Sequence, residues 1–195
     1  MQKKSTRVRK EEIVQAALGV VGKRGVRSLT ISAIAESAGM SEANIYRHFG
    51  GKDDILLAMA DFIGTSLVAK AATIAAGSRN PLDKLETIFF LHIALITEHS
   101  GIPRFVFSDD IHLSHKNIAE RLALRICNYI ETLAGVVAAG VAEGELRPGL
   151  FPRETALTLL GMIQFTALRW TISSESFEIR QEAENLWQNF KELVS

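Results

Sequence analysis

Apolar residues recur along most of this chain every three or four positions, which is the spacing of one face of an α-helix. Glycine, proline and small polar residues interrupt this spacing at several points, and such residues commonly begin or end helices. The pattern predicts an all-α protein of about nine helices, covering approximately residues 9–23, 31–38, 42–48, 52–76, 81–98, 103–111, 115–143, 153–173 and 177–193.

The patterns over 31–38 and 42–48 are short and close together. Thr30 and Ser41 stand just before them, where a hydroxyl can accept hydrogen bonds from the free N–H groups of a first turn. Gly39 lies between them, where a tight turn needs positive φ or close approach of the backbone. This arrangement predicts a helix-turn-helix, whose second helix enters the major groove of DNA.

The second of these helices carries side chains that its packing does not use. Asn44 can pair with adenine, Arg47 with guanine or phosphate, and Glu42 with the N4 group of cytosine. Ala43 can touch a thymine methyl group. We therefore expect this helix to read base edges in the groove.

A longer run of residues supports the same interpretation. It contains a turn glycine, a serine, the motif Tyr-x-x-Phe and a lysine followed by two acids, here Gly39, Met40, Ser41, Ile45, Tyr46, Phe49, Lys52, Asp53 and Asp54. The run resembles the DNA-binding signature of TetR-type transcriptional regulators, and departs from it at Gly50-Gly51, where that family often has Pro or Lys and then Ser. With the phosphate contacts that the resemblance implies, the predicted DNA-binding residues are Thr30, Ser41, Glu42, Ala43, Asn44, Tyr46, Arg47, His48 and Lys52.

The last two predicted helices offer a surface for association with a second copy. The small Gly161 lies among larger apolar residues of helix 153–173, so that another helix can approach closely. The resemblance implies a homodimeric four-helix bundle, and two recognition helices reading a palindromic operator also require a two-fold axis. Residues 144–152 resemble the loop that precedes this pair in the family. The predicted dimer interface consists of Leu157, Leu160, Gly161, Gln164, Leu168, Leu186, Trp187 and Phe190.

Charge is divided unevenly along the chain, although the formal net charge is zero. Residues 1–60 hold ten Lys and Arg against six Asp and Glu, whereas residues 61–195 hold twelve against sixteen. A basic head on an acidic body favours a DNA-facing module at the N-terminus. Lys3 and Lys4 belong to a basic arm, residues 1–8, that either reaches phosphates and the minor groove or is a solvated tail.

The cysteine content and the N-terminal sequence indicate the cellular compartment. Cys127 is the only cysteine, so no intramolecular disulfide forms, as suits a reducing cytoplasm. The basic N-terminus has no apolar signal region, and no uncharged apolar run reaches 18 residues. We expect a cytoplasmic protein that does not enter membranes, with residues 1–51 as the DNA-binding domain and residues 52–195 as the effector-binding and dimerisation domain.

The apolar body is suited to a pocket for a small apolar or amphipathic effector, since such pockets are mostly apolar and lie between bundled helices. No cofactor is expected. An effector that binds one spacing of the two DNA-binding heads better than another would release a repressor from its operator. Half or more of the candidate lining residues would be plain core; the candidates are Phe62, Phe89, His92, Ile93, Ile96, Phe105, Tyr129, Leu133, Met162, Phe165 and Trp170.

Three alternatives remain beside a ligand-released repressor. The run over residues 41–49 and the apolar body also resemble nucleoid-occlusion factors, which act through a protein partner. His112, His115 and the neighbouring Asp109 and Asp110 could bind a transition metal, although their spacing matches no closed structural site. An enzyme is disfavoured, because we find no phosphate-binding glycine loop, nucleophile elbow or helical metal-hydrolase motif.

Overall fold

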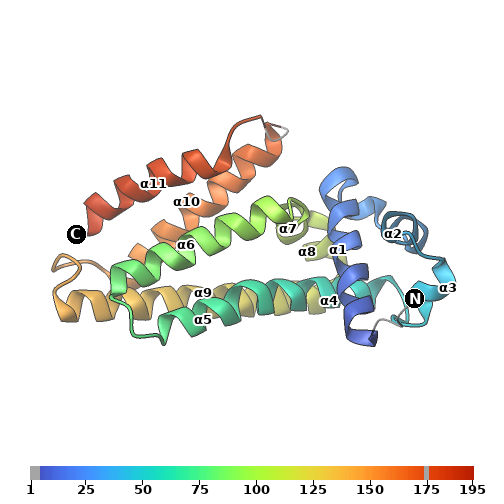
Figure 1. Ribbon diagram of the computed structural model, residues 1–195, viewed down its shortest axis with the longest axis horizontal. Coiled ribbons are helices and arrows are strands. Elements are labelled where there is room, and N and C mark those ends of the chain that lie inside the picture. The colour runs from blue at the N-terminus through green and yellow to red at the C-terminus, as the bar shows by residue number, and fades with distance from the viewer. Residues whose placement is uncertain (1–4, 174–175) are drawn as a thin grey trace. The chain divides into compact units, whose positions relative to one another are not determined.

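The computed structural model describes residues 5–173 and 176–195. All regular structure in those residues is helical, which confirms the predicted all-α fold (Figure 1). The elements are α1 (Thr6–Arg24), η1 (Val26–Ser28), α2 (Ile31–Ala38), α3 (Glu42–Tyr46), α4 (Lys52–Ile63), η2 (Gly64–Val68), α5 (Ala69–Ala75), α6 (Pro81–Glu98), α7 (Gly101–Val106), α8 (Asp109–Ser114), α9 (Lys116–Glu143), α10 (Pro152–Ile172) and α11 (Ile179–Val194).

Two of the predicted helices are subdivided. The helix predicted over 52–76 contains a π-helical turn, η2, between α4 and α5. The helix predicted over 103–111 is replaced by α7 and α8, which are separated by Phe107 and Ser108. Ser108 has extended backbone, with φ −75° and ψ 123°, and two aspartates follow it in the first turn of α8. Acidic residues favour a helix N-terminus, so a new helix begins there.

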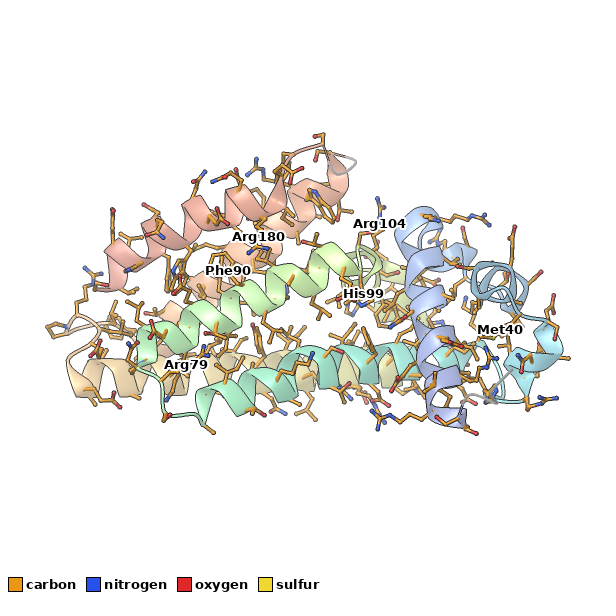
Figure 2. All side chains as sticks on the ribbon, viewed as in Figure 1. Met40, Arg79, Phe90, His99, Arg104 and Arg180 are labelled. Carbon is orange, nitrogen blue, oxygen red and sulfur yellow. The ribbon has the colours of Figure 1, made fainter. Side chains whose placement is uncertain are left out.

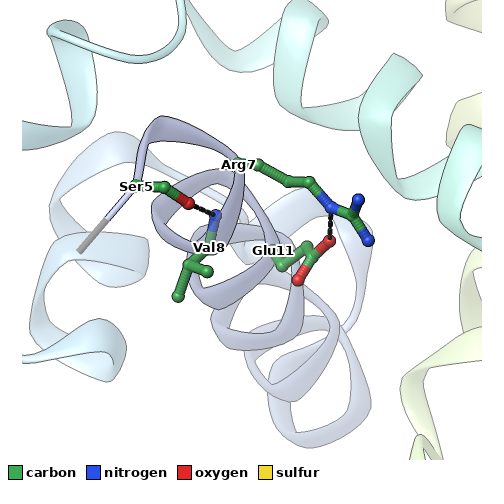
Figure 3. A network of polar contacts seen from close by, with 4 residues as sticks. All are labelled: Ser5, Arg7, Val8 and Glu11. Carbon is green, nitrogen blue, oxygen red and sulfur yellow. Dashed lines mark hydrogen bonds and ion pairs between the residues drawn. The ribbon is translucent and has the colours of Figure 1, made fainter.

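The first helix begins at Thr6, earlier than the predicted residue 9. Ser5 explains the difference, because its hydroxyl accepts a hydrogen bond of 3.3 Å from the N–H of Val8 (Figure 3). Arg7 also pairs with Glu11 one turn later, at 3.0 Å. Part of the predicted basic arm is therefore helical, whereas Lys3 and Lys4 lie outside the described residues.

The described residues form two compact units, and the first comprises 5–63 and 99–122. Helix α1 packs against α2, α4 and α7 through buried residues such as Ile13 and Leu18. The backbones of α1 and α7 touch, because a Cβ atom on Gly101 would collide with the carbonyl group of Leu18. The long-range packing on α1 thus holds the helix-turn-helix in a rigid frame.

The second unit comprises residues 64–98, 123–173 and 176–195. Its centre is an aromatic cluster in which Trp187 of α11 lies 5.5 Å from Phe89 and 5.7 Å from Phe190, measured between ring centroids. Trp187 and Phe190 are each only 1% exposed, and Leu160 is 8% exposed. Trp187 and Phe190 are therefore packed in the core of the protomer and Leu160 keeps little exposed surface, while the dimer interface stays a prediction.

Two helical stretches, Lys52–Ala75 and Lys116–Glu143, are long and apolar enough to cross a membrane by length and composition. The core helices of soluble bundles share these properties. In the first stretch, Ile55, Leu56 and Met59 are fully buried in the first unit, so their apolar character already has a role in packing.

Candidate DNA-binding surface and effector region

The turn between α2 and α3 is built from local hydrogen bonds. The Thr30 and Ser41 hydroxyls accept from Ala33 N–H at 3.1 Å and from Asn44 N–H at 3.2 Å, so each caps its helix. Gly39 has left-handed backbone, with φ 61° and ψ 38°, and ends α2. Both hydroxyls and the glycine take the positions that the sequence predicts for a helix-turn-helix.

The next residue completes this turn. Met40, marked in Figure 2, donates from its backbone N–H to the carbonyl oxygen of Ala35 at 2.9 Å. A bond of this kind across a left-handed glycine is the Schellman motif, which satisfies a free carbonyl at the helix end.

Gly39→Ala is expected to lower the free energy of unfolding by about 1–2 kcal/mol, which is the cost of placing an L-residue in the left-handed region. The space around Gly39 is open, so the loss would come from the backbone rather than from a collision. Urea denaturation at fixed protein concentration measures the change. Gly51→Ala is the matched control, because Gly51 also faces open space and its φ is not left-handed. Equal stabilities of the two variants would contradict the turn geometry.

Helix α3 has one buried face and one exposed face. Ile45 is fully buried and Phe49 is 6% exposed, so both anchor the helix to the first unit. Glu42, Tyr46 and Arg47 are exposed, and no hydrogen bond or ion pair within residues 5–173 and 176–195 engages their side chains. The structure thus leaves these groups free to meet a ligand, and their contacts with DNA remain a prediction.

The other predicted contacts on this surface have intermediate or full exposure. Ser41 and Ala43 are exposed, whereas Asn44, His48 and Lys52 are half-buried. The Nδ1 atom of His48 is buried and has no hydrogen-bond partner in the described part of the chain. This leaves Nε2 as the ring nitrogen through which His48 would meet a phosphate.

The start of α4 lies just after the recognition helix. The Asp54 carboxylate accepts a hydrogen bond of 2.8 Å from the Gly50 N–H, and so stabilises the turn that precedes the helix. A Cβ atom on Gly50 would lie 2.9 Å from the same carboxylate oxygen. Glycine at position 50, which has no Cβ atom, is therefore matched to this close contact.

Two basic residues of α1 have side-chain contacts, one of them with Phe49, which follows α3 in the chain. The Lys10 ammonium group sits 5.1 Å from the centre of the Phe49 ring, and Arg9 pairs with Glu12 at 2.9 Å. The Arg9–Glu12 pair is partly buried, with each side chain 29% exposed.

The candidate effector residues are divided between the two units. Phe62 and Phe105 lie in the first unit, where Phe62 stacks edge-on against His99 at 5.1 Å. Phe165 is 63% exposed on α10, so it lies at the surface of the protomer and not in its interior. Met162 is half-buried, and the remaining candidates are buried in the second unit: Phe89, His92, Ile93, Ile96, Tyr129, Leu133 and Trp170.

One polar pair lies within this apolar interior. The Tyr129 hydroxyl is 3.3 Å from Nδ1 of His92, and the two rings meet edge-on with centroids 5.5 Å apart. His92 is 3% exposed and Tyr129 is 2% exposed. Burial lowers the pKa of His92 to about 3 and raises the pKa of the Tyr129 hydroxyl, so both groups are uncharged at neutral pH.

Two other features of the second unit go beyond the residues predicted from the sequence. A groove of about 480 Å³ lies between α6 and α11, and Phe90 and Arg180 on its walls are marked in Figure 2. Most of its lining is polar, unlike an apolar effector pocket.

The second feature is an exposed apolar face on α10. We call it the α10 stripe, and it consists of Leu157, Gly161, Phe165, Leu168 and Ile172. Phe165 and Ile172 are 63% and 73% exposed, which is high for residues of this size. Their spacing to Leu157 and Leu168, in steps of three and four, is the signal in the sequence that would have identified them. Of the other predicted interface residues, Gln164 and Leu186 are half-buried.

The histidines proposed as metal ligands have other contacts. His112 forms a hydrogen bond of 2.7 Å to the carbonyl oxygen of Val106, and His115 lies 3.5 Å from Asp53. In the part of the chain that the structure describes, no group of three His, Cys, Asp or Glu residues is arranged to hold a metal ion.

Comparison with known proteins supports the regulator fold. The fatty acid metabolism regulator protein of Bacillus subtilis is 22% identical over 176 residues, 90% of each chain. The nucleoid occlusion factor SlmA of Vibrio vulnificus is 27% identical over 184 residues, 92% of each chain. The crystal structure of the transcriptional regulator FadR from Bacillus subtilis in complex with stearoyl-CoA has a TM-score of 0.74 at 20% identity, covering 92% of this chain and 96% of that one.

Family matches cover both parts of the chain. Residues 13–59, which contain the helix-turn-helix, match the bacterial regulatory proteins of the tetR family. Residues 78–171 match the tetracyclin repressor-like C-terminal domain. The chain therefore belongs to the TetR family of DNA-binding transcriptional regulators.

Proposed function

We propose that this regulator is a repressor that binds a palindromic operator as a homodimer and leaves it when a small apolar or amphipathic effector binds. The observation that carries the proposal is the free, exposed face of α3, held on a rigid frame by Ile45 and Phe49. Thr30 and Lys52 precede or begin α2 and α4, where helix dipoles favour a phosphate.

The α10 stripe supports the dimer. A run of exposed apolar residues along one helix is suited to burial against a second copy of the same helix. Two-fold symmetry would then place two recognition helices at half-sites roughly 34 Å apart. In this proposal residues 1–51 read the DNA, residues 52–195 bind the effector and dimerise, and the protein acts in the cytoplasm.

Acyl compounds are the first effectors to test. One relative is named a fatty acid metabolism regulator, and a structural neighbour was solved with stearoyl-CoA. The second unit of this chain has the buried apolar side chains that a fatty acyl chain would need, including Phe89, Ile93 and Leu133.

Two variants test the recognition helix. Asn44→Ala is expected to reduce discrimination between the operator and an operator with one altered base pair by about 1–3 kcal/mol, if the amide contacts adenine with two hydrogen bonds. Lys52→Ala should weaken binding to all sequences alike and reduce the slope of log affinity against log salt by about one. Fluorescence anisotropy over a range of salt concentrations measures both. Wild-type behaviour of both variants would place the recognition surface elsewhere.

A nucleoid-occlusion role is the second candidate, and the 27% identity to SlmA favours it. A protein of that kind would bind many dispersed chromosomal sites and a protein partner in place of a small molecule. Operator affinity that is unchanged by acyl compounds, together with binding sites scattered away from promoters, would support it over the repressor.

A further inference from the structure

His92 and Tyr129 form a polar pair among apolar neighbours in the core of the second unit. Its nearest buried neighbours along α6 and α9 are apolar, with Phe89 and Leu133 fully buried. Replacing both partners of a buried hydrogen bond by apolar groups is often nearly neutral for stability. Packing alone therefore does not require a histidine and a tyrosine at these positions.

The hydrogen bond between His92 and Tyr129 leaves some donors and acceptors of the two side chains without a partner. If the Tyr129 hydroxyl donates to Nδ1 of His92, the neutral ring carries its proton on Nε2. Within residues 5–173 and 176–195 the ring makes no other hydrogen bond, so the Nε2–H donor is unpartnered in a side chain that is 97% buried. The tyrosine oxygen likewise keeps free lone pairs.

Two charged residues of α9 lie near Tyr129: Glu131, which is exposed and lies 3.5 Å from Arg153, and Arg125, one helical turn before Tyr129. The Arg125 side chain packs directly on Gly64 of η2, in the place where a Cβ atom would be. The guanidinium group of Arg125 therefore points toward the π-helical turn η2. The group near Tyr129 that can bind a ligand is then the uncharged Nε2–H donor of His92. Such a donor suits a neutral acceptor better than a carboxylate.

We propose that His92 and Tyr129 bind the carbonyl group of an uncharged acyl effector, an ester, thioester or amide, with Nε2–H donating to the carbonyl oxygen. This inference rests on the proposed function and specifies its ligand. The acyl chain lies among apolar side chains of α6 and α9. A free fatty acid binds less well, because its carboxylate would lose hydration next to neutral groups.

The test is calorimetric titration of the full-length protein with three probes that share one chain length: methyl decanoate, decyl methyl ether and decanoate. Wild type is expected to bind the ester about five- to tenfold more tightly than the ether, which lacks the carbonyl group, and more tightly than decanoate. His92→Phe and Tyr129→Phe should bind ester and ether alike, and His92→Gln, which keeps a donor, should restore part of the difference. His112→Phe is the control, because His112 is exposed on α8.

Several results would overturn the inference. These are equal binding of ester and ether by wild type, an undiminished preference in His92→Phe, or tighter binding of decanoate that is lost in Arg125→Gln. Failure of all three probes to bind would also overturn it. Operator binding is measured on the same preparations by anisotropy, so an intact repressor that ignores these ligands is distinguished from a protein that does not bind DNA. Thermal melts of each variant show whether it is folded.

Discussion

Leu168→Asp is expected to convert the dimer to a monomer and to lower operator affinity by about 10²- to 10⁴-fold. Leu168 is 41% exposed within the α10 stripe, and a carboxylate there would be buried without a partner in the dimer. The affinity falls because a monomer binds only one half-site. Linking two binding modules typically raises the overall affinity by about 10²- to 10⁴-fold, and the monomer loses this gain. Sedimentation velocity measures the association state and anisotropy the affinity.

Leu124→Asp is the matched control, since Leu124 is 62% exposed on α9 and lies outside the α10 stripe. It should remain a dimer and bind the operator as wild type does. If Leu168→Asp remains a dimer, or if only Leu124→Asp becomes a monomer, the interface lies on another face of the second unit.

Trp187→Ala is expected to lower the free energy of unfolding by about 3–5 kcal/mol, the range for removing a large aromatic side chain from a core. The indole contacts Phe89 and Phe190, so its loss leaves a cavity within the aromatic cluster. Urea denaturation at fixed protein concentration measures the effect, because the proposed dimerisation would make stability depend on concentration.

The control for this variant is Gln188→Ala, since Gln188 is exposed on the same helix and its change should stay within about 0.5 kcal/mol. If Trp187 were an interface residue, as its sequence position suggested, Trp187→Ala would weaken the dimer and leave the stability of the protomer nearly intact. That outcome would contradict the core described here.

The helix-turn-helix could be predicted because its determinants are local. Thr30, Gly39 and Ser41 act within one turn of their own positions, so their spacing in the sequence already specifies the caps and the left-handed turn. The predicted start of α1 at residue 9 lies three residues too late, because Ser5 caps the helix and it begins at Thr6.

The second unit was less predictable, for a physical reason. An apolar stripe at helical spacing shows that one face of a helix is covered, and it does not show whether the cover is the same chain or another copy. The pattern therefore predicts Trp187 and Phe190 at the interface and Phe165 in the interior, whereas in the protomer Trp187 and Phe190 are buried and Phe165 is exposed. The His92–Tyr129 contact joins residues 37 positions apart, which no local pattern reveals.

Chromatin immunoprecipitation with sequencing of the tagged protein in its own cell is the most direct test of the central claim. The repressor hypothesis predicts one or a few peaks at promoters, which share a palindrome with half-sites about one helical turn apart. It also predicts that a deletion strain raises transcription of the adjacent genes. Many peaks scattered along the chromosome away from promoters, with no change in transcription, would contradict a local repressor and favour the nucleoid-occlusion role.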